Sequence, residues 1–341
     1  MMRRNITGIL LFSFCTLSLR ADEAEDKAVT SIEALGGKAK RDEKNAGKPV
    51  VSVDLSRSKV TNEDLKLLLP LKQLEYLSLF DTKVSDPGLI VLGKLGQLKI
   101  LSLDSTKVTD DGLKQLAALK RLDNLNLNRT GITGDGLKEL SSLRHLSLWR
   151  TNVTEAGLKQ IGNLKQLQSL YLADTRLNDA WLRQLAGLTE LQFLNLSSAL
   201  VTDVGLNELT EMKKLQRLTL DFTKVTDAGL KHLAGLAQLK TLSLVRTQVT
   251  GDGLKYFHEH KVLSELYLRE TKVSDASLKE LAAIVQLEEL SLAGTTVTDA
   301  GIMQLSSLKK LQILSLNKTK VTATGAAELK KSLPKTFISI D

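Results

Sequence analysis

The residues best suited to chemistry in this sequence are its four histidines, His145, His232, His258 and His260. The run His258-Glu259-His260 suggests a metal site, because imidazole and carboxylate groups are common zinc ligands. On a helix, however, residues two apart point to different sides. His260 also falls on a position that carries leucine (Leu236) one repeat earlier. We therefore predict that His260 packs in the core and that the chain has no metal site.

No other group of residues forms a catalytic pattern. P-loop, Rossmann and Gly-x-Ser-x-Gly motifs are absent from the sequence, and carboxylates recur so regularly that pairs of them carry no information. The single cysteine, Cys15, lies in a segment that we expect to be removed. The remaining chain then has no disulfide, no thiolate zinc site and no cysteine nucleophile. We predict a protein that is not an enzyme, with no catalytic residue and no cofactor.

The N-terminus has the pattern of a secretory signal peptide. Arg3 and Arg4 precede an apolar stretch from Ile6 to Leu19, and an acidic run follows Ala21. The stretch is shorter than the roughly 20 residues that span a bilayer. We expect cleavage after Ala21 and export to the periplasm, the cell surface or the medium, with an uncleaved anchor as the alternative. Loss of the three leader arginines reduces the formal charge from +8 to +5.

The rest of the chain is a repeat built on leucine, which supplies 71 of the 341 residues. Pairs of the form Leu-x-Leu, such as Leu77/Leu79, recur every 24 residues, except for one interval of 21 between Leu125 and Leu146. The alternation at each pair predicts a short strand with one buried face. Leucines at helical spacing then predict a short helix, which should be shorter in the 21-residue repeat. One unit cannot bury its leucines alone, so stacked units must share a continuous core.

Two polar positions mark the joint between strand and helix. The position held by Asp227 carries Asp, Asn or Gly in most repeats, and Pro87 follows Asp86. These residue types cap helices, so we predict that the Asp position is the N-cap. A second position carries threonine in most repeats, as at Thr82 and Thr223. We expect its hydroxyl to bond backbone groups of neighbouring coils.

These residues carry a family resemblance. The pattern L-x-x-L-x-L-x-x-T-x-V-T-D-x-G-L over residues 50–341 resembles the leucine-rich repeat family, and its T-D-x-G-L element is similar to the cysteine-containing, ribonuclease-inhibitor-like subtype. The chain also resembles exported bacterial leucine-rich repeat proteins. The resemblance implies an α/β, right-handed solenoid shaped as an open horseshoe, with parallel strands on the concave face and short helices on the convex face. It also implies a mainly protein-binding role.

The expected domain organisation follows from these patterns. Residues 1–21 are the signal peptide, and residues 22–49 are an N-terminal cap with a helix over Ala28 to Leu35 and a hairpin leading into the first strand. Residues 50–341 form the solenoid of about twelve repeats, including a closing strand over 336–341. A cap is expected because a terminal repeat otherwise exposes its core edge, and a disordered linker over residues 22–49 is the alternative.

The outward positions of the strands have the composition of a binding face. They form four columns, aligned with Tyr76, Ser78, Phe80 and Asp81, which hold eight of the eleven aromatic residues and six of the eleven arginines that follow the leader, but only one lysine. Such a bias is typical of protein interfaces, although strands favour aromatic residues in any case. The candidate site residues are Tyr76, Phe80, Arg129, His145, Trp149, Arg150, Tyr171, Phe193, Arg217, Phe222, Arg246, Tyr267 and Arg269. The expected centre comprises His145, Trp149, Arg150, Tyr171 and Phe193.

Charge narrows the class of partner. The four columns lack the basic stripe that nucleic acid requires, and surplus lysines such as Lys231 lie on the helices. We predict an exported scaffold that binds a protein or peptide on the concave face, without nucleic acid and without a membrane span once the leader is removed. The alternatives are a carbohydrate- or cell-wall-binding module that uses Trp149, Tyr171 and Phe193 as sugar platforms, and a substrate adaptor similar to F-box receptors. Weak attachment to an anionic cell surface is a further alternative.

Overall fold

The computed structural model describes residues 23–45 and 47–341, so the expected signal peptide lies outside the described residues. The chain forms two compact units. The first holds the residues up to Ile132 together with Glu139–Leu143, and the second holds Thr133–Lys138 and Arg144–Asp341. The boundary coincides with the 21-residue repeat, whose helical segment is a single five-residue 3-10 helix, η3 (Asp135–Glu139).

The N-terminal segment of the first unit is a helix followed by a hairpin. Residues 23–34 are helical, so the helix begins earlier than the sequence suggested. Strand β1 (Lys38–Arg41) then pairs antiparallel with β2 (Val50–Asp54). Arg41 joins helix and hairpin, because its guanidinium lies 2.5 Å from Asp26 Oδ1 and 3.5 Å from Glu25 Oε2. Ile32 is buried beneath them.

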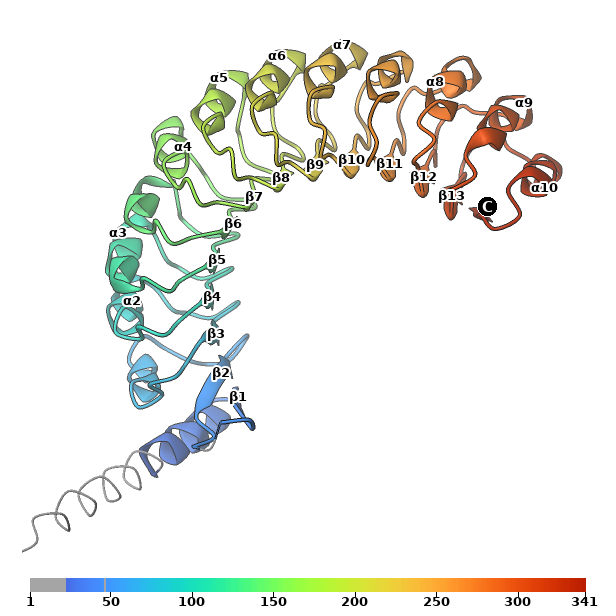
Figure 1. Cartoon of the computed structure of the whole chain (residues 1–341). Coiled ribbons are helices and arrows are strands. Elements are labelled where there is room, and N and C mark those ends of the chain that lie inside the picture. The colour runs from blue at the N-terminus through green and yellow to red at the C-terminus, as the bar shows by residue number, and fades with distance from the viewer. Residues whose placement is uncertain (1–22, 46) are drawn as a thin grey trace, which may run out of the picture. The chain divides into compact units, whose positions relative to one another are not determined.

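Each later repeat forms one coil that contains a three-residue strand and a short helical segment. In the first unit, β2 to β5 pair in parallel and in register, with the helical segments on the opposite side (Figure 1). Its elements after β2 are η1 (Asp64–Leu68), β3 (Tyr76–Ser78), α2 (Asp86–Leu92), β4 (Ile100–Ser102), α3 (Asp110–Leu113), η2 (Lys114–Ala118) and β5 (Asn124–Asn126).

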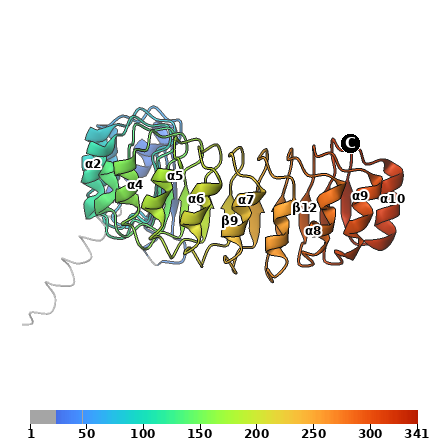
Figure 2. The same ribbon diagram turned by 90° about the horizontal axis from the view of Figure 1, so that it is seen from above.

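The second unit repeats this arrangement, and its helices stand side by side (Figure 2). Strands β6 to β14 pair in parallel without a change of register. Its strands are β6 (His145–Ser147), β7 (Ser169–Tyr171), β8 (Phe193–Asn195), β9 (Arg217–Thr219), β10 (Thr241–Ser243), β11 (Glu265–Tyr267), β12 (Glu289–Ser291), β13 (Ile313–Ser315) and β14 (Phe337–Ser339). Its helices are α4 (Glu155–Ile161), α5 (Asp179–Leu182), η4 (Arg183–Leu185), α6 (Asp203–Leu206), η5 (Asn207–Leu209), α7 (Asp227–Leu230), η6 (Lys231–Leu233), η7 (Asp252–Phe257), η8 (Asp275–Ser277), α8 (Leu278–Ala282), α9 (Asp299–Ile302), η9 (Met303–Ser307) and α10 (Ala323–Ser332).

The core is the leucine ladder that the repeat predicts. Leu170, Leu194 and Leu218 occupy the same register on successive strands, and none of them is exposed. Many helical segments pass from α to 3-10 geometry within one or two turns, as in α7 and η6. Such segments are too short to be stable alone, so their leucines must be held by stacking against neighbouring coils.

The predicted N-cap position is wrong for most coils. The residue that caps α7 is Thr226, and Asp227 is the first helical residue; Ser85 and Asp86 have the same relation in α2. The aspartate instead reaches the next coil. The carboxylate of Asp227 accepts hydrogen bonds from the backbone N–H and the hydroxyl of Thr250, at 2.7 and 2.8 Å. The column therefore joins successive coils rather than closing its own helix.

The predicted partner of the threonine column is also wrong. The hydroxyl of Thr223 donates to the carbonyl of Leu220 in its own coil, at 2.6 Å, and Thr82 does the same to Leu79 at 2.8 Å. This bond closes the turn after each strand. A hydroxyl can satisfy a carbonyl three residues earlier because the chain reverses there.

None of the helices in the described residues has the length and apolarity needed to cross a bilayer.

Candidate binding site

The strand face of the second unit is the surface formed by the outward residues of β6 to β14 and by the two outward residues of the turn after each strand. In the coil of β7, for example, it comprises Ser169, Tyr171, Ala173 and Asp174. The intervening leucines point inward and are buried. Because the strands stay in register, each outward residue stacks on its equivalent about 4.8 Å away in the next coil.

The turn after each strand holds one residue in the left-handed conformation. Arg150, Asp174, Phe222, Arg246 and Glu270 all have φ between +54° and +60°. Residues other than glycine seldom adopt this conformation, and each instance is destabilising by about 1–2 kcal/mol. The backbone N–H of this residue donates to a carbonyl of the next coil, as Asp174 does to Ser197 at 2.8 Å. These bonds fix the direction in which the side chains project.

Two predicted residues, Tyr171 and Phe193, form an aromatic pair across neighbouring strands. Their ring centroids lie 4.5 Å apart, with the planes inclined by 33°. Tyr171 is 37% exposed, although it belongs to a rigid strand. The guanidinium of Arg217, one strand further, lies 5.9 Å from the centre of the Phe193 ring. We call Tyr171, Phe193 and Arg217 the aromatic cluster.

The other members of the predicted centre lie in the coil of β6. The guanidinium of Arg150 packs over the ring of Trp149 at 4.8 Å and also pairs with Asp174 of the next coil. Trp149 and His145 are each half-buried. His145 stands opposite Ser169 in the sheet register, and Ser169 in turn stands opposite Phe193. The centre is therefore arranged over three consecutive coils.

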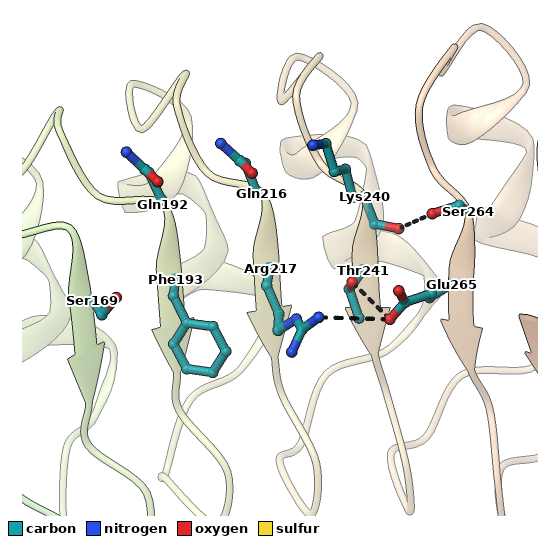
Figure 3. Close-up of a pocket in the computed structure, with 9 residues that line it drawn as sticks. All are labelled: Ser169, Gln192, Phe193, Gln216, Arg217, Lys240, Thr241, Ser264 and Glu265. Atoms are coloured by element: carbon teal, nitrogen blue, oxygen red, sulfur yellow. Dashed lines mark hydrogen bonds and ion pairs between the residues drawn. The ribbon is translucent and has the colours of Figure 1, made fainter.

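Next to the aromatic cluster the face is hollowed. The hollow has a volume of about 270 Å³, and Figure 3 shows its lining residues, which come from five successive coils. The side chains of Gln192 and Gln216 extend side by side along one edge, and those of Phe193 and Arg217 project from the strands below them (Figure 3). The lining residues are Ser169, Gln192, Phe193, Gln216, Arg217, Lys240, Thr241, Ser264 and Glu265.

Glu265 is the acidic end of the hollow. Its Oε2 accepts from the Thr241 hydroxyl at 3.0 Å and lies 3.8 Å from the Arg217 guanidinium. The Tyr267 hydroxyl donates to the same oxygen at 3.4 Å. Glu289 stands directly opposite Glu265 in the next strand. Burial, followed by the charges of Glu289 and Glu265, raises the pKa of Tyr267, so the phenol remains a hydrogen-bond donor at neutral pH.

Beyond the hollow, the turns carry another cation–aromatic contact. The Arg246 guanidinium lies 5.2 Å from the centre of the Phe222 ring, and Phe222 is 51% exposed. Arg246 and Arg269 both pair with Glu270. The hydrogen bond from Arg246, which outweighs partial burial, and the bond from Arg269 hold the pKa of Glu270 below its usual value. The Glu270 carboxylate is therefore ionised, and both arginines form ion pairs with it.

Three predicted residues belong to the first unit. Phe80 lies beneath the guanidinium of Arg57, at 5.2 Å. Tyr76 is half-buried on β3, and Arg129 is exposed in a left-handed turn. They occupy the strand face of that unit.

Seven of the nine residues that line the hollow are not among the predicted site residues. Ser169, Thr241 and Glu265 stand in a strand column that we had identified, but only its aromatic, arginine and histidine members were named. Gln192, Gln216, Lys240 and Ser264 occupy the column immediately before the strands. A usable signal was present, since three adjacent coils carry glutamine at this position, as Gln168, Gln192 and Gln216.

The two histidines of the His-Glu-His run face different neighbours. The Nε2–H of His260 donates to the carbonyl of Ala234 in the preceding coil at 2.9 Å, whereas His258 Nε2 lies 3.2 Å from Glu280 Oε2 in the following coil. His260 is buried and its ring meets Phe257 edge-on, with centroids 5.0 Å apart. Among the described residues, no three His, Cys, Asp or Glu side chains are grouped to hold a metal ion.

Comparisons with known proteins identify the fold. No protein-family model and no curated protein sequence matches the chain. The structure is similar to that of an internalin (inlF) from Listeria monocytogenes, with a TM-score of 0.66 at 22% sequence identity over 94% of each chain. At this identity the similarity shows the fold alone, which is an α/β leucine-rich-repeat solenoid.

Two further solved structures are more distant. A leucine-rich repeat protein of Leptospira interrogans gives a TM-score of 0.46 at 20% identity, over 85% of this chain and 89% of that chain. The plant peptide hormone receptor RGFR1, solved in complex with RGF2, gives a TM-score of 0.41 at 18% identity, over 75% of this chain and 53% of that chain.

Proposed function

We propose that this protein is a binding scaffold, without catalytic activity, that recognises an extended segment of a protein partner on the strand face of the second unit. The observation that carries the proposal is the aromatic cluster beside the hollow. It offers exposed aromatic and arginine side chains on rigid strands, and these are the residue types that most often dominate binding energy at protein interfaces.

The dimensions of the hollow suit a short extended peptide. From Ser169 to Glu265 the lining crosses four strand spacings, about 19 Å in total. An extended chain advances about 3.3 Å per residue, so about six residues would span the hollow. The chemical character of the lining changes along the hollow, with the apolar ring of Phe193 first, the cations Arg217 and Lys240 next and the acid Glu265 at the far end. A complementary segment would present an apolar side chain, an acid and then a base.

The ion pair between Arg217 and Glu265 must open when such a ligand binds, and opening it costs little free energy. The two groups are 3.8 Å apart, and their side chains are 52% and 33% exposed. Ion pairs of this kind contribute about 0–1 kcal/mol. Opening the pair to receive two opposite charges therefore costs little.

A protein ligand is favoured over a sugar because arginine side chains pack against the faces of the aromatic rings. Guanidinium groups lie over Trp149, Phe193 and Phe222. Sugar platforms need open ring faces, whereas a ring paired with arginine offers a mixed apolar and hydrogen-bonding surface of the kind found at protein interfaces.

The test is selection from a displayed heptapeptide library on immobilised protein comprising residues 22–341. Peptides that bind the wild type should lose at least about thirtyfold in affinity, about 2 kcal/mol, against Tyr171→Ala/Phe193→Ala. Tyr256→Ala/Phe337→Ala is the control, because Tyr256 on η7 and Phe337 on β14 are also exposed aromatics but lie away from the hollow. Peptides that bind both variants as well as the wild type would contradict the proposed site.

We also propose that the chain is exported through its first 21 residues, on the strength of the arginine-then-apolar pattern described above. Expression of the full sequence in a bacterial host, followed by N-terminal sequencing of the mature protein, tests this directly. A first residue of Asp22 in an exported fraction is the expected result. Retention of the intact chain in the cytosol would contradict it.

A further inference from the structure

A row of cations runs along one edge of the coils, outside the strand face. It occupies the position immediately after the threonine column, and in the sequence seven of its twelve members are Lys or Arg and none is Asp or Glu. In the second unit the cations are Arg176, Lys224, Lys272 and Lys320, which recur at every second coil. All four are exposed. We call these four residues the edge row.

The backbone keeps the edge row in register. The N–H of Lys224 donates to the carbonyl of Val201 in the preceding coil at 3.1 Å, and Lys272 and Lys320 make the same bond to Val249 and Val297. A second ladder of hydrogen bonds therefore runs beside the strands. At about 4.8 Å per coil, neighbouring cations of the row stand about 10 Å apart.

The cations of the edge row have no acidic partner among the described residues. Within residues 23–45 and 47–341, the ion pairs of the second unit engage other bases, and no side-chain hydrogen bond involves these four residues. The acids nearest in sequence are already occupied. Asp174 pairs with Arg150, and Glu270 pairs with Arg246.

The aspartates on the other side of the edge row are occupied as well. Asp227, three residues after Lys224, accepts hydrogen bonds from Thr250, Gly251 and Gly253 of the next coil. Its carboxylate is thus held by backbone and hydroxyl donors. The edge row is a line of unneutralised positive charge, one residue wide.

We propose that the edge row binds a linear acidic polysaccharide that lies along the direction of stacking. This inference is independent of the proposed peptide site, because the row lies outside the strand face. The distance between neighbouring cations of the edge row indicates which kind of charged polymer it can match. Duplex DNA carries a charge about every 1.7 Å and requires a dense basic stripe, whereas the edge row offers one cation about every 10 Å.

A polysaccharide with one carboxylate per disaccharide presents sparse charges of this kind. A membrane would need a broad basic patch, and the edge row is only one residue wide. The intervening positions, Leu200, Gln248 and Thr296, are exposed and neutral. They can contact the uncharged sugars between carboxylates.

The first unit has a denser version of the same row. Lys59, Lys83 and Lys107 stand on three successive coils, about 4.8 Å apart, and all are exposed. Among the described residues none of them has an ion-pair partner. The spacing of about 10 Å is specific to the edge row of the second unit. The variants below therefore change only the edge row and keep these three lysines.

The experiment measures binding of hyaluronate oligosaccharides to protein comprising residues 22–341, with dextran as the neutral polymer. The wild type should bind hyaluronate and not dextran, and its affinity should fall as salt rises from roughly 50 to 200 mM. Arg176→Gln/Lys224→Gln/Lys272→Gln/Lys320→Gln should weaken binding at least about tenfold. The matched control removes the same charge from exposed residues of the same unit that lie outside the edge row, as Lys159→Gln/Arg183→Gln/Lys213→Gln/Lys231→Gln, and should bind within about twofold of the wild type.

Several results would overturn the proposal. They are absence of hyaluronate binding by the wild type, equal weakening in both quadruple variants, or tighter binding to a short DNA duplex or to phosphatidylserine vesicles than to hyaluronate. Circular dichroism of each variant confirms that it is folded. Since the quadruple variants leave the strand face unchanged, selection of heptapeptides on them separates a failure here from a failure of the proposed function.

Discussion

The carboxylate of Asp203 accepts two hydrogen bonds from Thr226 in the next coil, one from the backbone N–H at 2.8 Å and one from the hydroxyl at 2.6 Å. Gly229 of that same coil lies against the carboxylate, because a Cβ built on it would stand 2.4 Å from Asp203 Oδ1. The Thr-Asp-x-Gly motif is therefore a clamp between successive coils. Aspartate supplies the acceptor, threonine the donors, and glycine the space.

Departures from the motif support this interpretation. Where glycine replaces the aspartate, at Gly251, the glycine of the next coil is replaced by Ser277, whose hydroxyl occupies the vacated space, 2.6 Å from a Cβ built on Gly251. Where Glu155 replaces it, the following coil carries Trp181 in the glycine position. Each aspartate of the column is followed by a glycine in the next coil. Gly157, which follows Gly134, is needed for another reason, because a Cβ built on it would stand 2.0 Å from the carbonyl oxygen of Thr133.

The clamp predicts the effect of a single methyl group. Gly229→Ala should reduce the free energy of unfolding by about 1–3 kcal/mol, because the new Cβ meets the Asp203 carboxylate. Gly235→Ala is the control in the same coil, since its Cβ would meet only the mobile end of Lys213, at 3.4 Å. Urea unfolding measures both. In a double-mutant cycle, Asp203→Ala/Gly229→Ala should lose less than the sum of the two single changes, and strict additivity would contradict the clamp.

Asp227 predicts part of the acid sensitivity. Burial raises its pKa, but hydrogen bonds from Thr250, Gly253 and Gly251 together outweigh burial, so the folded-state pKa lies below 3.8. A lowered carboxylate pKa stabilises the fold above the unfolded value, and this stability is lost as the pH falls through the folded value. Asp227→Asn should therefore lower stability at pH 7 by about 1–3 kcal/mol and flatten the acid limb of the unfolding curve. Asp252→Asn, at an exposed neighbour, should leave that limb unchanged.

His260 predicts a second pH effect at higher pH. Burial lowers its pKa below 6.5, although the hydrogen bond to the Ala234 carbonyl opposes the shift. The unfolded chain then binds the proton more tightly, so stability is complete above pH 6.5 and falls as the pH drops from there toward the folded-state pKa. His260→Leu should remove this component from thermal unfolding measured between neutral and mildly acidic pH. An unchanged dependence in His260→Leu, compared with the control His232→Gln, would show that His260 is not its source.

Substitution of a strand-face aromatic residue should cost much less free energy of unfolding than substitution of a core leucine. Tyr171→Ala should change the free energy of unfolding by only about 1 kcal/mol, because the side chain is exposed and loses mainly its contact with Phe193. Leu170→Ala, at the adjacent and fully buried position, should cost about 2–5 kcal/mol through the cavity that it leaves. Chemical denaturation measures both changes. The reverse order would place Tyr171 in the core and would contradict the strand-face assignment.

The opposed carboxylates of Glu265 and Glu289 predict a stabilising substitution. Like charges directly opposite each other across a strand pair are unfavourable. Glu289→Gln should raise the free energy of unfolding by up to about 1 kcal/mol at low salt, and the gain should shrink as salt screens the pair. Glu288→Gln makes the same change of net charge one residue earlier. A gain of equal size there would attribute the effect to net charge.

The sequence by itself determined the coil and most of the strand face. Burial of Leu170 and Leu194, the parallel register of their strands, and the outward position of Tyr171 and Phe193 all follow from one local rule, the alternation of side chains along a strand repeated every 24 residues. The shortened helical segment of the 21-residue repeat was predicted for the same reason. These features depend on residues close in the chain, so their spacing is sufficient to predict them.

Only the tertiary structure decided what each polar column contacts. The capping interpretation of Asp227 was wrong because its partner, Thr250, lies one coil away, and a repeat shows which positions are equivalent but not which of them touch across coils. The hollow beside Phe193 likewise needs five coils to exist. Lys224 makes no ion pair with the acids of the described residues, because the neighbouring carboxylate of Asp227 accepts hydrogen bonds from the next coil. Such relationships arise between coils, and their geometry is set by how the coils stack.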